Sequence, residues 1–278
     1  MKARCAMEII DSHVHLSKYG HESKSFAEVR DALLQDMRSH DIAHAIIFPD
    51  SEPSDVVAGL DECLRLAEGS PGLSVAGTVF VPTIQPGDVE KLRALASAGR
   101  IVGLKLYPGF EVFYPAEERC HPLYQMCLEY SMPVVFHSGE SLHLPERERL
   151  NHPNEIAKVA RLFPELQIVI AHFSQPHIFA CRDVVLACPN IHVDISGLAH
   201  PEVIEACGQG QIRRVLRQVA SCRPDKLLFG TDWPLCDVKL HIDLVISLPI
   251  PGADKQSIMG GNARRLFRLK RQDQAKAE

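Results

Sequence analysis

The sequence predicts an α/β protein folded as a single, distorted (β/α)₈ TIM barrel, and three observations support this. Short runs rich in β-branched residues alternate with amphipathic stretches along nearly the whole chain, as they do where helices connect parallel strands. The alternation repeats eight times, which is the number of units that closes a barrel. No glycine-rich phosphate turn follows any of the runs, which argues against an open, doubly wound sheet.

The predicted strands are short apolar runs in which β-branched residues recur, a composition that favours a pleated sheet. Each run is followed by polar residues and then by a stretch with helical spacing. We expect strands at residues 7–10, 44–48, 74–81, 101–107, 133–137, 166–172, 191–196 and 226–232.

The intervening stretches have apolar residues three and four positions apart, which predicts amphipathic helices. The last helical region should be interrupted by the segment "LPIPGAD", and the polar tail at about 270–278 should be a solvated helix end or disordered. We expect helices within residues 25–40, 54–69, 87–99, 120–130, 152–163, 178–187, 202–220 and 238–269.

Composition indicates one globular domain over residues 1–278, because 46% of the chain is hydrophobic and 23% is charged. A net charge of −5 gives no reason to expect a nucleic acid partner. The nine cysteines contain no C-x-x-C pair, so we expect reduced core residues of a cytoplasmic protein. No apolar run has the length of a membrane span or a signal peptide. The expected partner is a small-molecule substrate, and a homodimer is left open.

The first predicted strand leads into "DSHVHL", in which one residue separates His13 from His15. Side chains at i and i+2 of a strand point the same way, so these two imidazoles can face one point. The pair alone is weak evidence, since about 0.7 such pairs are expected by chance in this composition.

Ionisable residues recur at the ends of other predicted strands. The carboxyl ends of barrel strands surround the active site, and buried charges there are costly unless they are paired or bound to a metal. Six strands contribute such residues, which are His13, His15, Lys105, His137, His172, Asp194 and Asp232. We therefore predict a metal site at this end of the barrel.

Imidazole and carboxylate donors suit a borderline divalent cation. Zn²⁺ is the first choice, and Mn²⁺ and Fe²⁺ remain open. Three or four protein ligands leave a position for water, whose pKa the metal lowers to about 7. We expect one metal ion per chain.

Six motifs, "DSHVHL", "GLKLYP", "VVFHSGE", "IAHFS", "FGTDWP" and "IMGGNARRLF", make the chain resemble the amidohydrolase superfamily, and within it the amidohydrolase-related ("amidohydrolase 2") group. The resemblance runs from about Glu8 to Phe267. It implies a metal-dependent barrel enzyme, either a hydrolase or lactonase, or a non-oxidative decarboxylase of unsaturated or aromatic carboxylic acids.

The resemblance also implies roles for individual residues. His13, His15, His137 and Asp232 correspond to metal ligands. His172 corresponds to a second-metal ligand or to the catalytic acid/base, and we predict that His172 and Asp232 are the catalytic residues.

Lys105, Tyr107 and Trp233 are the predicted substrate-binding residues. In two-metal relatives a lysine on the fourth strand is often carboxylated and bridges the metals. An unmodified Lys105 would instead pair with a substrate carboxylate or support the strand end. Trp233 either walls the pocket or packs between barrel and helix.

Residues near these have weaker assignments. Asp11 either braces the end of the first strand or makes an ordinary turn, and Asp194 is expected to support the site rather than to react. Glu140, Arg147 and Arg149 lie in a long loop, where they select an anionic substrate or form a solvated face.

Three functional hypotheses follow. The first is a metal-dependent hydrolase of a small ester, lactone or amide that bears a carboxylate. In it Asp232 accepts a proton from the attacking water, and His172 stabilises the oxyanion or protonates the leaving group. The second is a metal-dependent decarboxylase with the same ligands. The third is an inactive barrel that binds a ligand, against which the intact ligand set argues.

Overall fold

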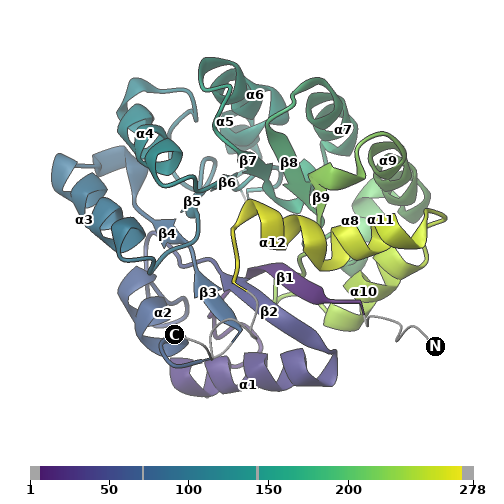
Figure 1. Cartoon of the computed structure of the whole chain (residues 1–278), viewed down its shortest axis with the longest axis horizontal. Coiled ribbons are helices and arrows are strands. Elements are labelled where there is room, and N and C mark those ends of the chain that lie inside the picture. The colour runs from purple at the N-terminus through teal and green to yellow at the C-terminus, as the bar shows by residue number, and fades with distance from the viewer. Residues whose placement is uncertain (1–6, 71, 142–143, 271–278) are drawn as a thin grey trace.

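Nine short parallel strands surround the centre of the molecule, and helices form a ring outside them (Figure 1). The computed structural model describes residues 7–70, 72–141 and 144–270. In these residues the strands are β1 Ile9–Val14, β2 Ile42–Ile47, β3 Leu73–Val75, β4 Gly77–Thr78, β5 Leu104–Leu106, β6 Val134–Phe136, β7 Ile168–Ile170, β8 Ile191–Asp194 and β9 Leu227–Leu228. The protein is thus a TIM barrel, as predicted.

The strands pair in two arcs, β1-β2-β3 and β4-β5-β6-β7-β8-β9. The run predicted as one strand at 74–81 is divided at Ala76, so β3 and β4 share one position in the barrel. At the other seam the Ser12 amide donates to the Phe229 carbonyl oxygen at 3.0 Å, and Val14 forms a parallel bridge with Trp233. These contacts join β1 to the segment that follows β9.

The helices occupy the predicted stretches, with two corrections. The short helix α5, Glu148–Asn151, lies in the segment predicted to be a long loop. The stretch 202–220 is two helices rather than one, because Gly208 between them has φ +80°, a left-handed conformation that ends a helix. The helices are α1 Phe26–Ser39, α2 Leu60–Ala67, α3 Pro86–Ser97, α4 His121–Glu129, α5 Glu148–Asn151, α6 Pro153–Leu162, α7 Ile178–Ala187, α8 Pro201–Cys207, α9 Gln209–Cys222, α10 Val238–Ile246, α11 Gly252–Gln256 and α12 Asn262–Leu266.

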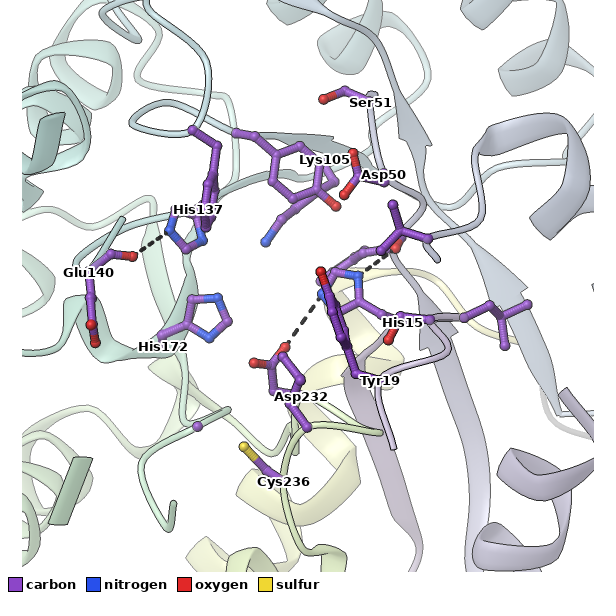
Figure 2. A pocket seen from close by; sticks show the side chains of 18 of the residues that line it. His15, Tyr19, Asp50, Ser51, Lys105, His137, Glu140, His172, Asp232 and Cys236 are labelled. Atoms are coloured by element: carbon purple, nitrogen blue, oxygen red, sulfur yellow. Dashed lines mark hydrogen bonds and ion pairs between the residues drawn. The ribbon is translucent and has the colours of Figure 1, made fainter. Parts of the chain in front are cut away.

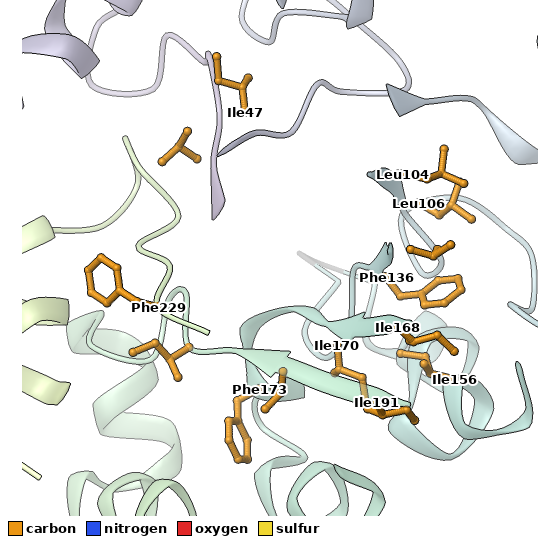
Figure 3. Close-up of a cluster of buried hydrophobic side chains, with 14 of the residues drawn as sticks. Ile47, Leu104, Leu106, Phe136, Ile156, Ile168, Ile170, Phe173, Ile191 and Phe229 are labelled. Atoms are coloured by element: carbon orange, nitrogen blue, oxygen red, sulfur yellow. The ribbon is translucent and has the colours of Figure 1, made fainter. Parts of the chain in front are cut away.

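Alternation along the strands divides the buried side chains into two clusters. Leu104, Leu106 and Phe136 face the helices and belong to the larger cluster (Figure 3). Val135 belongs to the smaller cluster inside the barrel, and the register pairs it with Lys105. Because side chains at paired positions of a sheet lie on the same face, Lys105 points into the barrel.

The amino-terminal end of the barrel is closed by the last helical region. Phe267 and Leu269 join the inner cluster, and the Asn262 amide group donates to the carbonyl oxygen of Leu227 at the start of β9. The predicted polar tail lies, from residue 271 on, outside the described residues. Among the described helices we find none with the length and apolar character that crossing a membrane requires.

Candidate metal and active site

A cavity of about 590 Å³ opens at the carboxyl ends of the strands (Figure 2). Its walls come from the segments after seven strands, and they include His15, Phe48, Tyr107, His137, His172, Gly197 and Asp232. The volume is in the range of sites that bind small molecules.

Two histidines and one aspartate converge at one point of this cavity. His13 Nε2 lies 3.2 Å from His15 Nε2, and Asp232 Oδ1 lies 3.5 and 3.4 Å from these two nitrogens. His13 lies at the end of β1 and His15 directly follows the strand, with both side chains on one face, as the H-x-H spacing predicts. Asp232 follows β9 with φ +72°, a left-handed backbone that is uncommon outside glycine.

The Nδ1 atom of each of these two imidazoles contacts an oxygen atom outside the converging group. His13 Nδ1 lies 2.9 Å from Asp194 Oδ2, and His15 Nδ1 lies 2.8 Å from the Phe48 carbonyl oxygen. Because these oxygens accept hydrogen bonds, both Nδ1 atoms carry the hydrogen and both Nε2 atoms present lone pairs. Burial, with the nearby Lys105 charge, lowers the pKa of His13 to about 3, so that ring is neutral. Two lone pairs and a carboxylate facing one point are suited to a divalent cation.

A buried aspartate ties the two ligand-bearing segments together. Asp11 Oδ1 accepts hydrogen bonds from the His13 amide at 3.2 Å and the Thr231 amide at 3.0 Å, and Oδ2 accepts one from Thr231 Oγ1 at 2.6 Å. Burial raises the pKa of Asp11 to about 7 despite these hydrogen bonds. Asp11 therefore braces β1 against the segment after β9, which is the first of its two predicted roles.

Asp194, at the end of β8, connects two of the candidate residues. Besides its contact with His13, its Oδ1 accepts hydrogen bonds from the amides of His172 at 2.9 Å and Ser196 at 3.1 Å. Burial opposes ionisation, but the electrostatic interaction and the hydrogen bond with His13 hold the pKa of Asp194 well below its usual range. Asp194 is buried behind the histidines, where it orients them.

His172 lines the cavity beside the converging ligands. Its ring centroid lies 4.7 Å from that of His13 and 5.1 Å from that of His137. The backbone of His172, Phe173 and Ser174 has φ values of +57°, +49° and +52°, a left-handed run that turns the chain sharply after β7. Burial lowers the pKa of His172, against the opposing charge of Asp232.

His137 lies on the same wall, but with a different contact. Its Nε2 is 3.0 Å from the Glu140 carbonyl oxygen, which leaves Nδ1 as the ring nitrogen available to a ligand. Among the described residues, two groups have donor atoms that lie mutually within 4.8 Å: one is His13, His15 and Asp232, and the other, behind it, is His13, His172 and Asp194. The structure therefore brings three of the four predicted ligands together and places His137 beside them.

A model of the amidohydrolase family matches residues 10–269. The chain belongs to the amidohydrolase family. The similar solved structures from this family include both hydrolases and decarboxylases, and the family is metal-dependent. A search of curated proteins gave no match.

Three solved structures share the fold of this amidohydrolase. An uncharacterized TIM-barrel protein from Bordetella bronchiseptica is 20% identical, with a TM-score of 0.75 over 94% of this chain and 98% of that one. A 5-carboxyvanillate decarboxylase from Sphingomonas paucimobilis is 14% identical, with a TM-score of 0.70 over 95% and 100%. A probable 2-pyrone-4,6-dicarboxylic acid hydrolase from Acinetobacter baumannii is 17% identical, with a TM-score of 0.67 over 95% and 100%.

Lys105 lines the cavity, and its positively charged side chain reaches into the cavity interior. The side chain is fully buried, and its ammonium group has no hydrogen-bond partner in the described part of the chain. The group lies 5.0 Å from the ring centroid of Phe48 and 5.1 Å from that of Tyr107. Burial lowers the pKa of Lys105 to about 8, although Asp194, Asp232 and Asp50 act to raise it. Figure 2 shows the ammonium pointing between His137 and the group formed by His15 and Asp232.

Tyr107 and Trp233 differ in their relation to the cavity. Tyr107 lines it, and its hydroxyl donates to the Pro49 carbonyl oxygen at 2.7 Å. Among the residues that the structure describes, Trp233 is not part of the lining, and its indole N–H donates to Asp36 of α1 at 2.8 Å. Trp233 thus packs against α1 outside the cavity lining, and its role in substrate binding stays a prediction.

The two loop arginines also lie away from the cavity. Arg147 donates to the Phe110 carbonyl oxygen, and Arg149 to the Tyr114 hydroxyl. Arg147 is half-buried and Arg149 is exposed, and both donate to carbonyl oxygens of the loops, which they hold in place. Glu140 does line the cavity, near its mouth beside His137.

Sequence reasoning missed Glu111, a buried carboxyl that joins three loops around the cavity. It accepts hydrogen bonds from Ser51 Oγ at 2.6 Å and from the Val81 amide at 2.7 Å. Burial raises its pKa to about 7. Nothing in "YPGFEVFYP" distinguishes this glutamate from a solvated one, because its partners are remote in sequence.

Proposed function

We propose that this amidohydrolase hydrolyses a small ester, lactone or amide that bears a carboxylate, and that it uses one divalent metal ion, with Zn²⁺ as the first choice. The observation that supports the carboxylate is the buried ammonium of Lys105, which faces the cavity without a partner. A buried charge of this kind is costly unless a ligand of opposite charge compensates it.

The donor set fits such a metal. His13, His15 and Asp232 would hold it, and His137 is positioned to add a fourth donor through Nδ1. The ion supplies Lewis-acid activation of water and of the substrate carbonyl.

The protein's own residues divide the remaining work. Lys105 binds the substrate carboxylate and so fixes the orientation of the reacting carbonyl. Asp232 is ionised, because the nearby histidines outweigh the effect of burial and hold its pKa well below the usual range. It accepts a proton from the water that attacks the carbonyl. His172, beside the metal ligands, transfers a proton to the leaving group.

A second candidate function is non-oxidative decarboxylation of an unsaturated or aromatic carboxylic acid. The rings of Phe48 and Tyr107 flank Lys105, and they would suit a planar carboxylate. In that reaction Asp232 or His172 would protonate the carbon that loses CO₂. Similarity to the decarboxylase from Sphingomonas paucimobilis supports keeping this candidate.

One assay separates the two reactions. Zinc-loaded protein is offered a panel of carboxylated lactones, esters and amides, and a matched panel of hydroxylated benzoates. Acid release is followed at constant pH, and CO₂ is measured in the same samples. Acid release without CO₂, abolished in Asp232→Asn, is the expected result. CO₂ release from the benzoates would replace the first proposal with the second.

A further inference from the structure

Ser196 lies at the junction between Asp194 and His172. Its side chain is fully buried, with Oγ 2.6 Å from Asp194 Oδ1 and 2.8 Å from His172 Nδ1. Its distance to His13 Nδ1 is longer, at 3.2 Å, and that nitrogen already has a nearer acceptor in Asp194 Oδ2.

The position of each hydrogen atom in this group follows once the atoms that can only accept a hydrogen bond are identified. Asp194 Oδ1 receives the amide hydrogens of His172 and Ser196, so this oxygen is an acceptor. A hydroxyl 2.6 Å from such an oxygen donates its single hydrogen to it. The Ser196 oxygen then has only lone pairs left to offer to His172. The hydrogen between Ser196 and His172 must therefore belong to Nδ1 of the imidazole.

We infer that Ser196 is a positioning residue that fixes the tautomer of His172, so that the neutral ring presents Nε2 to the cavity without a hydrogen. The inference deepens the proposed function and rests on it only for its kinetic consequence. A ring held in this tautomer must first take up a proton at Nε2, the one that Asp232 accepts from water, before it can give one to the leaving group. His172 then returns to the same tautomer after each turnover, because Ser196 and Asp194 do not change.

Nuclear magnetic resonance of protein labelled with ¹⁵N-histidine tests the tautomer without any substrate. Long-range ¹H–¹⁵N correlations distinguish Nδ1–H from Nε2–H rings, and the spectrum of His172→Asn identifies the His172 signals. In the wild-type protein, with its metal removed, we expect an Nδ1–H ring for His172. In Ser196→Ala we expect a mixture of tautomers or the Nε2–H form.

Ser138→Ala is the matched control. Ser138 is another buried serine, and its hydroxyl donates to the carbonyl oxygen of Ala171, next to His172 in the chain, without contacting an imidazole in the described structure. This variant should keep the Nδ1–H ring of His172.

Kinetics supply the second readout once a substrate is known. Ser196→Ala should lower kcat by about 10- to 100-fold, the usual effect of losing a hydrogen bond behind a functional histidine, while KM and zinc content stay near wild type. An Nε2–H ring in the wild-type protein, or an unchanged tautomer in Ser196→Ala, would overturn the inference. Absence of turnover on every substrate would overturn the proposed function and leave the tautomer result standing.

Discussion

Replacing Lys105 with methionine should stabilise the protein while weakening substrate binding. The pKa of Lys105 falls from 10.5 to about 8 on folding. Keeping its ammonium charged at pH 7 therefore lowers the free energy of unfolding by about 3 kcal/mol. Methionine has a similar length and no charge, so Lys105→Met should raise the free energy of unfolding by about that amount. Losing a hydrogen bond to a charged group should raise KM about 10- to 100-fold.

The pH dependence of the free energy of unfolding tests whether this stabilisation comes from removing the Lys105 charge. Between pH 8 and pH 10.5 the unfolded chain holds a proton on Lys105 that the folded chain has begun to release, so this group makes wild-type stability rise with pH. The advantage of Lys105→Met should therefore be full at pH 7 and fall to about 1 kcal/mol at pH 9.5. Urea unfolding of both proteins, metal-free, at the two pH values measures it.

Lys226→Met is the matched control for this experiment. Lys226 is also buried, but its ammonium donates to the Pro189 carbonyl oxygen near His192, away from the cavity. Its replacement should lower stability and leave KM unchanged. The reasoning fails if Lys105→Met is no more stable than wild type at pH 7, or if its advantage does not shrink at pH 9.5.

Three further predictions concern the site and its surroundings. His172→Asn should keep its zinc and lose about 10²- to 10⁴-fold in turnover, and metal loss on elemental analysis would instead make His172 a ligand. A chelator should abolish activity, and about one equivalent of Zn²⁺ per chain should restore it. The variant His13→Ala should remain folded by circular dichroism but retain little zinc. Trp233→Phe removes the hydrogen bond to Asp36, so denaturant titration should show a loss of about 1 kcal/mol, and a changed KM would support its role in substrate binding.

The barrel was predictable because its strands and helices have distinct local patterns. All eight predicted strand positions and the break before α11 are present. The division of the third strand at Ala76 and the end of α8 at Gly208 were not predicted. Both depend on backbone geometry that composition does not reveal, since a glycine within an amphipathic stretch is compatible with either one helix or two.

The location of the site residues was predictable for residues that lie at strand ends. The position of His13, His15 and Asp232 follows from the rule that strand ends share one rim. The orientation of a ring does not follow, because it depends on partners remote in sequence. His137 turns Nε2 toward a carbonyl in its own loop, and Trp233 turns toward α1, although both lie in motifs that predicted a functional role.

The buried ionisable groups around the cavity are not explained by their contribution to stability. Around the cavity, Asp11, Lys105, His172 and Asp194 are ionisable side chains held in a medium that disfavours charge, and each has a pKa moved from its ordinary value. At the opposite end the buried Lys226 donates to a backbone carbonyl oxygen, whereas Lys105 has no such partner among the described residues. Had the groups around the cavity served stability, apolar residues of equal volume would serve it better. Their grouping around one cavity is expected where a binding site is preorganised at the expense of stability, with Asp194 and Asp11 hydrogen-bonded and Lys105 left for the ligand to satisfy.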